Sequence, residues 1–205
     1  VHQQGLILNW NNTYLNISSF IPCTKVEGPG KRFSIWVQGC LKRCKGCCNP
    51  IELKLIKKNI IPVDSLMAQI LQSQKINNIE GITFLGGEPV LQAKGLSYIA
   101  ENSQKHGLSV MLFTGYTQNE LDKYNFLFYK KLKSFSDIIV SGPYDQTKPD
   151  NMRNWIGSTN QEIHYLTNRY KPDIAYNNNY RNGIEFYISD EELTVTGFPF
   201  NIKLG

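Results

Sequence analysis

The chain has 205 residues, 41% of them hydrophobic and 19% charged, and a formal net charge of +5. This balance fits one soluble globular domain with a buried core. It excludes a membrane-spanning chain, because no apolar run approaches the roughly 20 residues that a spanning helix needs. Residues 1–10 also lack the basic start and apolar core of a signal peptide, so we expect a cytoplasmic protein.

The lysines are scattered along the chain, with mild clusters at residues 54–58 and 123–133. A basic surface can attract nucleic acid. No nucleic-acid-binding motif accompanies these clusters, so we interpret both as solvated helix faces. We expect neither a nucleic acid nor a membrane among the partners.

The first strand with a clear pattern is predicted over residues 32–38. Its apolar side chains, Phe33, Ile35 and Val37, alternate with those of the other face, which is the period of a half-buried strand. A glycine-containing turn at residues 27–30 precedes it, and it leads directly into Cys40. Residues 6–8 and 14–17 are predicted as short edge strands.

Strands and helices alternate after residue 50. We predict helices over residues 63–74, 91–106 and 117–133, and strands over residues 82–85, 109–113 and 137–140. Gly107 ends the second helix, and Thr117 with Glu120 forms a capping box that starts the third. A fifth strand is expected at residues 163–166. Residues 183–196 are predicted as a hairpin that packs beside the sheet or covers one of its ends.

This alternation predicts an α/β fold, a parallel sheet with helices on its outside. In such sheets the chemistry gathers at the carboxyl ends of the strands. Each unusual loop follows a strand at that end: the cysteine-containing residues 39–50, then residues 86–89, 114–116 and 141–143. Four loops at one edge predict a single active site.

Four of the five cysteines lie within residues 40–48, and Cys40, Cys44 and Cys47 have the spacing C-x-x-x-C-x-x-C. Such a loop can direct three thiolates to one metal centre, either an iron–sulfur cluster or zinc. Zinc needs a fourth ligand, which Cys48, His2, His106 or His164 can supply. We interpret Cys48 as a small packing residue and Cys23 as buried. The crowding of an odd number of cysteines in one loop argues against a disulfide framework.

The tetrapeptide Gly86-Gly87-Glu88-Pro89 directly follows a predicted strand. Two glycines let the backbone approach a ligand closely, and its carbonyl groups can accept hydrogen bonds from an ammonium group. Taken alone, the same tetrapeptide is also compatible with an ordinary strand-to-helix turn.

Together, the cysteine spacing and this tetrapeptide resemble the radical S-adenosylmethionine (radical SAM) superfamily. The resemblance implies that Cys40, Cys44 and Cys47 hold a [4Fe–4S] cluster whose fourth iron is chelated by SAM. One electron then cleaves SAM to a 5′-deoxyadenosyl radical. It further implies an oxidoreductase with SAM contacts at Gly86, Gly87, Glu88, Pro89, Cys48, Asn49, Thr114, Gly115 and Tyr116.

Within that superfamily the chain is most similar to the activating enzymes of glycyl-radical proteins, above all the activase of anaerobic (class III) ribonucleotide reductase. The similar stretches lie at residues 28–49, 86–89, 112–121, 137–144 and 153–163. The resemblance implies a small partial (β/α) barrel in a single domain of residues 1–205, with a core of about 24–167 and a C-terminal extension of 168–205. It also implies a large glycyl-radical protein as substrate and a flavodoxin or ferredoxin as electron donor.

Some positions depart from that family. Glu27 and Ser141 stand where the family has aspartate, Cys48 where it has an aromatic residue or histidine, and Glu162 where it has arginine. These changes leave the cofactor chemistry intact and bear on the partner protein. Two alternatives therefore stay open: a small radical SAM enzyme acting on a peptide or metabolite, and a non-catalytic iron–sulfur or zinc module. We assign no general acid or base.

Overall fold

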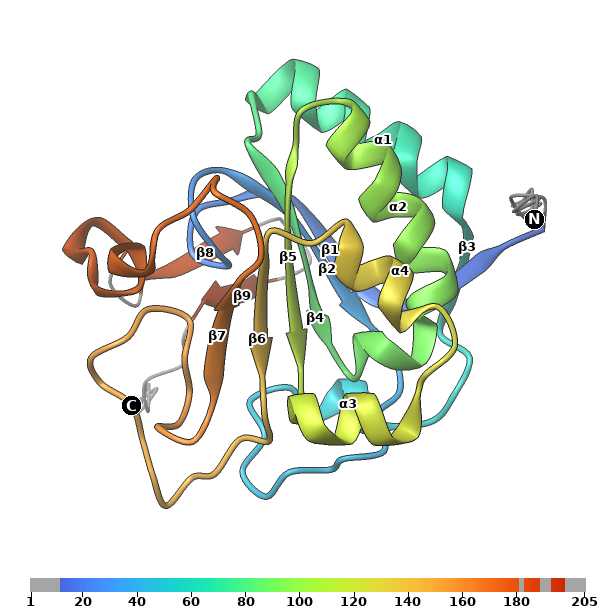
Figure 1. Cartoon of the computed structure of the whole chain (residues 1–205). Coiled ribbons are helices and arrows are strands. Elements are labelled where there is room, and N and C mark those ends of the chain that lie inside the picture. The colour runs from blue at the N-terminus through green and yellow to red at the C-terminus, as the bar shows by residue number, and fades with distance from the viewer. Residues whose placement is uncertain (1–11, 181–182, 189–192, 198–205) are drawn as a thin grey trace, which may run out of the picture.

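The computed structural model describes residues 12–180, 183–188 and 193–197, so the strand predicted at residues 6–8 and the candidate ligand His2 lie outside the described residues. A seven-stranded sheet in the order β3-β1-β2-β4-β5-β6-β7 forms the centre (Figure 1). Its strands are β1 (Tyr14–Thr24), β2 (Arg32–Val37), β3 (Asn59–Pro62), β4 (Gly81–Gly86), β5 (Ser109–Thr114), β6 (Ile138–Ser141) and β7 (Glu162–Tyr165).

Four neighbouring strands, β2, β4, β5 and β6, run parallel to one another. Strands β1 and β3 on one side and β7 on the other are antiparallel to their neighbours. The helices α1 (Val63–Asn77), α2 (Ala93–Lys105) and α4 (Tyr129–Ser134) cover one face of the sheet. The mixed α/β fold with a mainly parallel sheet is therefore as predicted.

Strand β2 is more deeply buried than predicted, because all six of its residues are buried. Phe33, Ile35 and Val37 join the core beneath the helices. Trp36, on the other face, packs with Ile21 and Leu85. A central parallel strand is covered on both faces, so the polar residues that suggested a half-buried strand are also enclosed.

The buried Arg32 is held at the amino-terminal end of the parallel strands. Its guanidinium donates to Thr83 Oγ1 at 2.6 Å, to Ser109 Oγ at 2.9 Å and to the carbonyl of Pro29 at 3.0 Å. Burial lowers the pKa of this guanidinium. These hydrogen bonds satisfy a charge that would be costly to bury alone, and they join β2, β4 and β5 at the end opposite the unusual loops.

On the β1 side one strand prediction needs correction and one strand was missed. The strand predicted at residues 14–17 extends to Thr24, and it is an inner strand because β3 pairs with its first half. Strand β3 itself was not predicted. Its four residues are mostly exposed, and so short a run shows no periodicity.

The helix predicted over residues 117–133 is two helices, α3 (Gln118–Tyr124) and α4. The capping box is present, with Glu120 N donating to Thr117 Oγ1 at 3.3 Å and Thr117 N donating to Glu120 Oε2 at 2.9 Å. The chain leaves the helix at Asn125, which has a φ of 44°, a conformation that asparagine adopts more readily than most residues. The helix predicted at residues 91–106 begins as the short 3₁₀ turn η2 (Pro89–Gln92) before α2.

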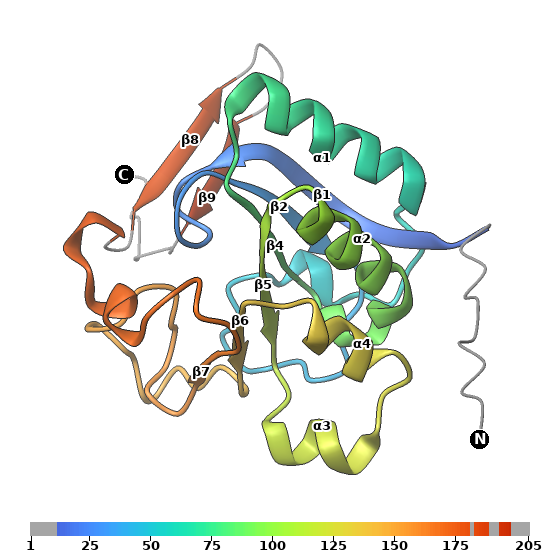
Figure 2. The ribbon, with the colours of Figure 1, turned by 45° about the horizontal axis from the view of Figure 1, so that its top comes forward.

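The C-terminal hairpin is formed by β8 (Ile184–Ile188) and β9 (Leu193–Gly197), as predicted. It lies beside the end of β1 and the turn that follows (Figure 2). Glu185 Oε2 accepts a hydrogen bond from Thr24 Oγ1 at 2.5 Å, and Glu27 Oε1 accepts one from Gly197 N at 2.8 Å. Burial raises the pKa of Glu27.

Among the residues that the structure describes, every helix is too short or too polar to cross a lipid bilayer.

Candidate functional site

The carboxyl ends of the parallel strands meet at one edge of the sheet. In Figure 1 the arrows of β4, β5 and β6 point to this edge, where the cyan segment after β2 and the helix α3 also lie. We call residues 39–50 the cysteine loop. The loop after β4 is hydrogen-bonded through its backbone to the end of β2 and to the beginning of the cysteine loop. Gly87 N donates to Val37 O and Glu88 N donates to Gly39 O, both at 2.8 Å.

The glycines of the β4 loop permit this contact. A Cβ atom on Gly87 would lie 2.4 Å from the carbonyl oxygen of Gly39 and 2.8 Å from that of Glu52. Gly86 has a φ of 104°, which side chains disfavour, and its carbonyl accepts a hydrogen bond from Asn49 Nδ2 at 3.4 Å. Two segments that the sequence separates by about 40 residues are thus packed backbone against backbone.

Glu88 is fully buried and connects the β4 loop with the β5 loop. Its carboxylate accepts hydrogen bonds from Thr114 Oγ1 at 2.8 Å, Gly115 N at 2.8 Å and Val90 N at 3.1 Å. Burial raises the pKa of Glu88 to about 7, although these hydrogen bonds favour the charged form. Both carboxylate oxygens are therefore engaged by the protein itself. Pro89, also buried, begins η2.

Lys42 fastens the cysteine loop to the start of α3. Its Nζ atom lies 2.8 Å from Glu120 Oε1 and 5.0 Å from the centre of the Tyr116 ring. The sequence analysis identified Glu120 only as a helix cap and missed Lys42. Nothing in the sequence pattern relates two residues 78 positions apart, so this contact could not be found without the fold.

The loop after β6 completes the edge. Gly142 N donates to Tyr116 O at 3.0 Å, and a Cβ atom on Gly46 would lie 2.3 Å from Gln146 Oε1. The buried Ser141 ends β6, and its hydroxyl is 2.8 Å from Nε2 of His164 on β7. All four loops therefore meet at one edge, as the strand order predicted.

The three motif thiols differ in exposure, with Cys40 buried and Cys44 and Cys47 partly buried. Burial raises the pKa of Cys40, while the backbone N–H groups of Arg43 and Lys42 partly offset this effect. A hydrogen bond with the Cys48 thiol lowers the pKa of Cys47 to about 6 and raises that of Cys48.

The thiols share one loop without forming a coordination sphere. Within the described ranges, no three His, Cys, Asp or Glu side chains gather closely enough to hold a metal ion. The ligand role of Cys40, Cys44 and Cys47 therefore stays a prediction. Cys48 is exposed, which corrects its interpretation as a packing residue. Cys23 is only partly buried, although it contacts the main core.

The donor set of this loop fits an iron–sulfur group. Three cysteine sulfurs leave one iron of a four-iron cluster without a protein ligand. Backbone N–H groups point at the sulfurs of Cys40 and Cys47, including that of Asn49 at 3.4 Å from Cys47 Sγ, and such bonds are a known means of tuning clusters. Nε2 of His164 is 2.8 Å from the Ser141 hydroxyl, and His106 lies between α2 and the start of β5, at the opposite edge of the sheet from the cysteine loop.

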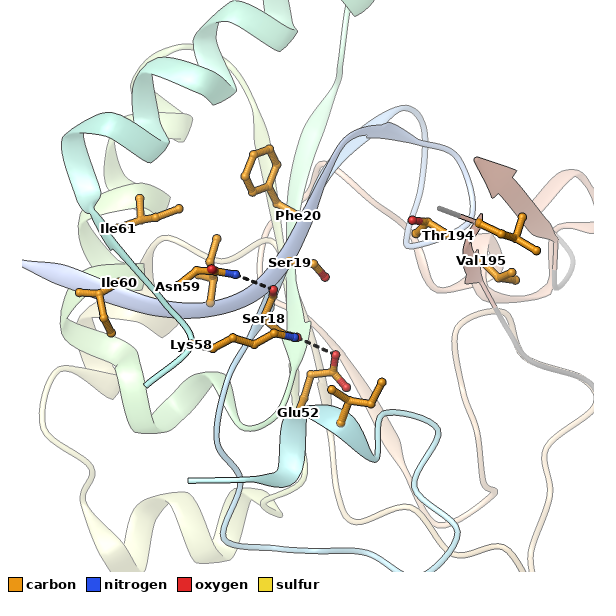
Figure 3. Close-up of a pocket in the computed structure, with 13 residues that line it drawn as sticks. Ser18, Ser19, Phe20, Glu52, Lys58, Asn59, Ile60, Ile61, Thr194 and Val195 are labelled. Atoms are coloured by element: carbon orange, nitrogen blue, oxygen red, sulfur yellow. Dashed lines mark hydrogen bonds between the residues drawn. The ribbon is translucent and has the colours of Figure 1, made fainter. Parts of the chain in front are cut away.

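A cavity of about 970 Å³ lies to one side of the cysteine loop (Figure 3). Its walls come from β1, from residues 51–61 and from β9. Ser18 lies at its centre: its hydroxyl donates to Glu52 Oε1 at 2.9 Å and accepts from Lys58 Nζ at 2.8 Å. This cavity was not predicted, because it depends on the position of the hairpin.

Comparison with known proteins agrees with this geometry. The profile of a family described as "4Fe-4S single cluster domain" matches residues 26–164. An anaerobic ribonucleoside-triphosphate reductase-activating protein of Vibrio cholerae is 31% identical over 160 residues, covering 75% of this chain and 99% of that protein.

Proteins of the same name in Pasteurella multocida and in bacteriophage T4 are also similar. The first is 32% identical and covers 75% of this chain and 99% of its own length. The second is 26% identical, with coverage of 73% and 93%. The chain therefore belongs to the 4Fe–4S single cluster domain family and, within it, to the activating enzymes known as anaerobic ribonucleoside-triphosphate reductase-activating proteins.

Proposed function

We propose that this protein is a radical SAM enzyme that installs a glycyl radical on a partner enzyme such as anaerobic ribonucleotide reductase. The observation that supports this function best is the junction between the cysteine loop and the β4 loop. There Glu88 N donates to Gly39 O at 2.8 Å, and Gly87 leaves no room for a side chain. A cluster held by the cysteine loop and a molecule held by the β4 loop would be immediate neighbours.

In this proposal Cys40, Cys44 and Cys47 hold the cluster. The β4 loop, from Gly86 to Pro89, holds the methionine part of SAM through its backbone, since the Glu88 carboxylate is already bonded to the β5 loop. The adenosyl part is bordered by Cys48, Asn49, Thr114, Gly115 and Tyr116.

Held there, the cluster would supply the electron for reductive cleavage of SAM to methionine, and SAM would supply the 5′-deoxyadenosyl radical that abstracts a hydrogen atom from a glycine Cα of the partner. The protein's task is to orient the two cofactors and to exclude water. Thr114, Glu88 and Tyr116 are buried at this edge of the sheet, and in this proposal they help to keep water from the radical. Hydrogen-atom transfer requires no general acid or base, and none is assigned.

The remaining expectations from the resemblance belong to this proposal. Residues 1–205 form one domain, with a partial (β/α) barrel core of about 24–167 and an extension at 168–205. The protein works in the cytoplasm. A flavodoxin or ferredoxin supplies the electron, because a single cluster cannot store electrons for repeated turnover.

The test is anaerobic loading with iron and sulfide, followed by SAM and dithionite. We expect a change in the electron paramagnetic resonance (EPR) spectrum of the reduced cluster when SAM is added, and formation of 5′-deoxyadenosine. Serine at Cys40, Cys44 or Cys47 should abolish both, whereas Cys23→Ser should retain both. A protein that binds zinc, or one that turns brown and leaves SAM intact, would contradict the proposal.

A further inference from the structure

An excess of positive charge lies in the cysteine loop and in the residues that follow it. Residues 41–61 contain six lysines and arginines and one glutamate, a formal charge of +5 that equals the net charge of the whole chain. The lysines at residues 54–58 were predicted to lie on a helix face. They lie instead in an irregular segment between η1 (Ile51–Leu53) and β3.

The same stretch exposes five large apolar side chains. The exposed fractions range from 47% for Ile60 to 64% for Ile51. We call the following residues the basic–apolar surface: Leu41, Arg43, Lys45, Ile51, Lys54, Leu55, Ile56, Lys57, Lys58 and Ile60. Exposed apolar side chains with polar groups around them are typical of a binding surface.

The backbone of this segment is fixed by hydrogen bonds to Gln38 and to Asn16 of β1. Gln38 Nε2 donates to Lys54 O at 2.7 Å, and Asn16 Nδ2 donates to Ile56 O at 2.7 Å. Lys58 N donates to Asn16 Oδ1 at 2.9 Å. The Leu55 side chain reaches back toward Gly39, the residue before Cys40, where an added Cβ would be 3.2 Å from it. The cysteine loop and residues 51–60 are therefore one continuous surface.

The basic–apolar surface also borders the cavity beside β1. Ile51, Ile60 and Val195 of β9 line this cavity, and Figure 3 shows Val195 on the opposite side from Ile60. One edge of the surface is thus a hollow with mixed polar and apolar walls, and Lys58 lies within it.

We infer that the basic–apolar surface is the docking site of the acidic electron-carrier protein that reduces this enzyme; the inference rests on the proposed function. The partner is a flavoprotein or iron–sulfur protein with a negatively charged face around an apolar patch. In the complex the donor's cofactor loses one electron and the cluster gains it, and no bond forms or breaks.

Charge complementarity carries this assignment. A surface with a formal charge of +5 attracts an acidic protein and raises the rate of encounter. Electron-transfer complexes are small and transient, and this surface includes the cysteine loop itself, so the donor would dock directly over the cluster. The glycine loop of the substrate protein must instead reach SAM among the strand ends. Nucleic acid is less suited, because the five apolar side chains would find no partner on a phosphate backbone.

The test compares two double variants with equal changes in net charge. Lys54→Glu with Lys57→Glu alters the basic–apolar surface, whereas Lys75→Glu with Lys94→Glu alters exposed lysines on α1 and α2. The probe is a bacterial flavodoxin titrated calorimetrically into the metal-free and the loaded protein, without SAM. We expect the first variant to weaken flavodoxin binding about tenfold or more and the second by less than about twofold, with wild-type binding falling as salt rises.

A second measurement separates docking from cluster assembly. Reduction of the loaded protein by flavodoxin hydroquinone should slow in the Lys54→Glu, Lys57→Glu variant, while photoreduction by 5-deazaflavin, a small molecule, should keep its rate. Ile56→Ser should weaken flavodoxin binding without changing its salt dependence. Because no step uses SAM, a protein that binds flavodoxin in this way and fails to cleave SAM would refute the proposed function and leave the docking site standing.

Three results would overturn the docking site. Equal weakening in both double variants would mean that net charge alone attracts flavodoxin. If the Lys54→Glu, Lys57→Glu variant binds flavodoxin as the wild type does but binds the large reductase more weakly, the surface belongs to the substrate protein. If the same variant loses binding to duplex DNA and keeps its binding to flavodoxin, the surface is a nucleic-acid site.

Discussion

The buried carboxyl of Glu88 shows how a single residue organises the candidate site. It accepts three hydrogen bonds from the β5 loop and from η2, and it has no contact with solvent. The sequence predicted its position at the end of a strand. The sequence could not predict that its carboxylate accepts hydrogen bonds from Thr114 and Gly115, because these residues lie at the end of another strand.

The raised pKa of Glu88 makes stability depend on pH. A carboxyl with a folded-state pKa of about 7, against 4.5 in the unfolded chain, binds its proton more tightly when folded. Its contribution to stability is therefore greatest at low pH and declines as the pH rises from about 4.5 to 7. Relative to Glu88→Gln, the wild-type unfolding free energy should fall by up to about 3 kcal/mol between pH 5 and 8.

Urea unfolding of the metal-free proteins measures this difference. Glu101→Gln is the control, because Lys105 and Lys131 lower the pKa of the Glu101 carboxyl. The difference in unfolding free energy between Glu101→Gln and the wild type should stay constant between pH 5 and 8 and change only in more acid solution. If the difference in unfolding free energy between Glu88→Gln and the wild type is also independent of pH, the Glu88 carboxyl is charged throughout this range.

Two glycines at the site should respond differently to alanine. In Gly87→Ala the added Cβ would meet backbone oxygens of Gly39 and Glu52 at 2.4 and 2.8 Å, and neither segment can move away easily. In Gly115→Ala it would meet only the Lys42 side chain, at 3.2 Å, and the Glu88 carboxylate, at 3.4 Å. We expect a loss of about 1–3 kcal/mol for Gly87→Ala and less than about 1 kcal/mol for Gly115→Ala. Thermal unfolding measures both, and equal losses would mean that the two loops are not packed backbone to backbone.

At the scale of elements, the cysteine loop has little regular structure and is held in place by its neighbours. The β4 loop holds its beginning, Lys42 holds its middle to α3, and residues 51–55 fold back over Gly39. An element of this kind cannot keep its shape alone, since few of its own residues are buried. Its stability is therefore a property of the whole edge of the sheet.

Loss of the Lys42–Glu120 ion pair should loosen the cysteine loop more than it destabilises the fold. The side chains are 18% and 31% exposed, so the pair contributes on the order of 1 kcal/mol or less to global stability. Lys42→Ala should release iron faster than wild type when the loaded protein is challenged with a chelator, with a nearly unchanged melting temperature. Lys105→Ala, which removes an exposed ion pair on α2, should release iron at the wild-type rate. Equal release from all three proteins would show that Lys42 does not hold the loop.

The periodicity of the sequence was sufficient to predict the parallel strands and the helices α1 and α2, because each has a continuous apolar face that packs in the main core. The periodicity failed where tertiary contacts decide the structure. Strand β3 is short and exposed, and it forms only because it pairs with β1. The break between α3 and α4 depends on left-handed Asn125 and Phe128, and a helical period continues through both residues without interruption.

At the scale of the molecule, the hairpin is an addition to the region that matches the family. The family profile ends at residue 164, and β8 and β9 lie beyond it. Glu185 binds the hairpin to the end of β1 through Thr24 Oγ1 and Lys25 N. The hairpin was predictable from its two apolar runs, but its docking site was not, because Glu27 and Glu185 give no periodic signal.

Glu185→Ala should loosen the attachment of the hairpin to the end of β1, leaving the contact of Gly197 with Glu27 and the rest of the fold intact. Hydrogen exchange of the β8 and β9 amides should become faster, while the β4 and β5 amides keep their protection. Glu162→Ala, at an exposed position of β7, should leave both groups unchanged. Faster exchange throughout the sheet would mean that the hairpin is an integral part of the core.

The central claim is that this chain makes a glycyl radical, and one EPR experiment tests it most directly. The loaded protein, SAM and a reductant are mixed without oxygen with the anaerobic ribonucleotide reductase of the same organism. We predict a glycine-centred radical doublet in the reductase that requires SAM and is absent with Cys44→Ser. Formation of 5′-deoxyadenosine without any radical on the reductase would contradict the claim and would point to a peptide or small metabolite as the substrate.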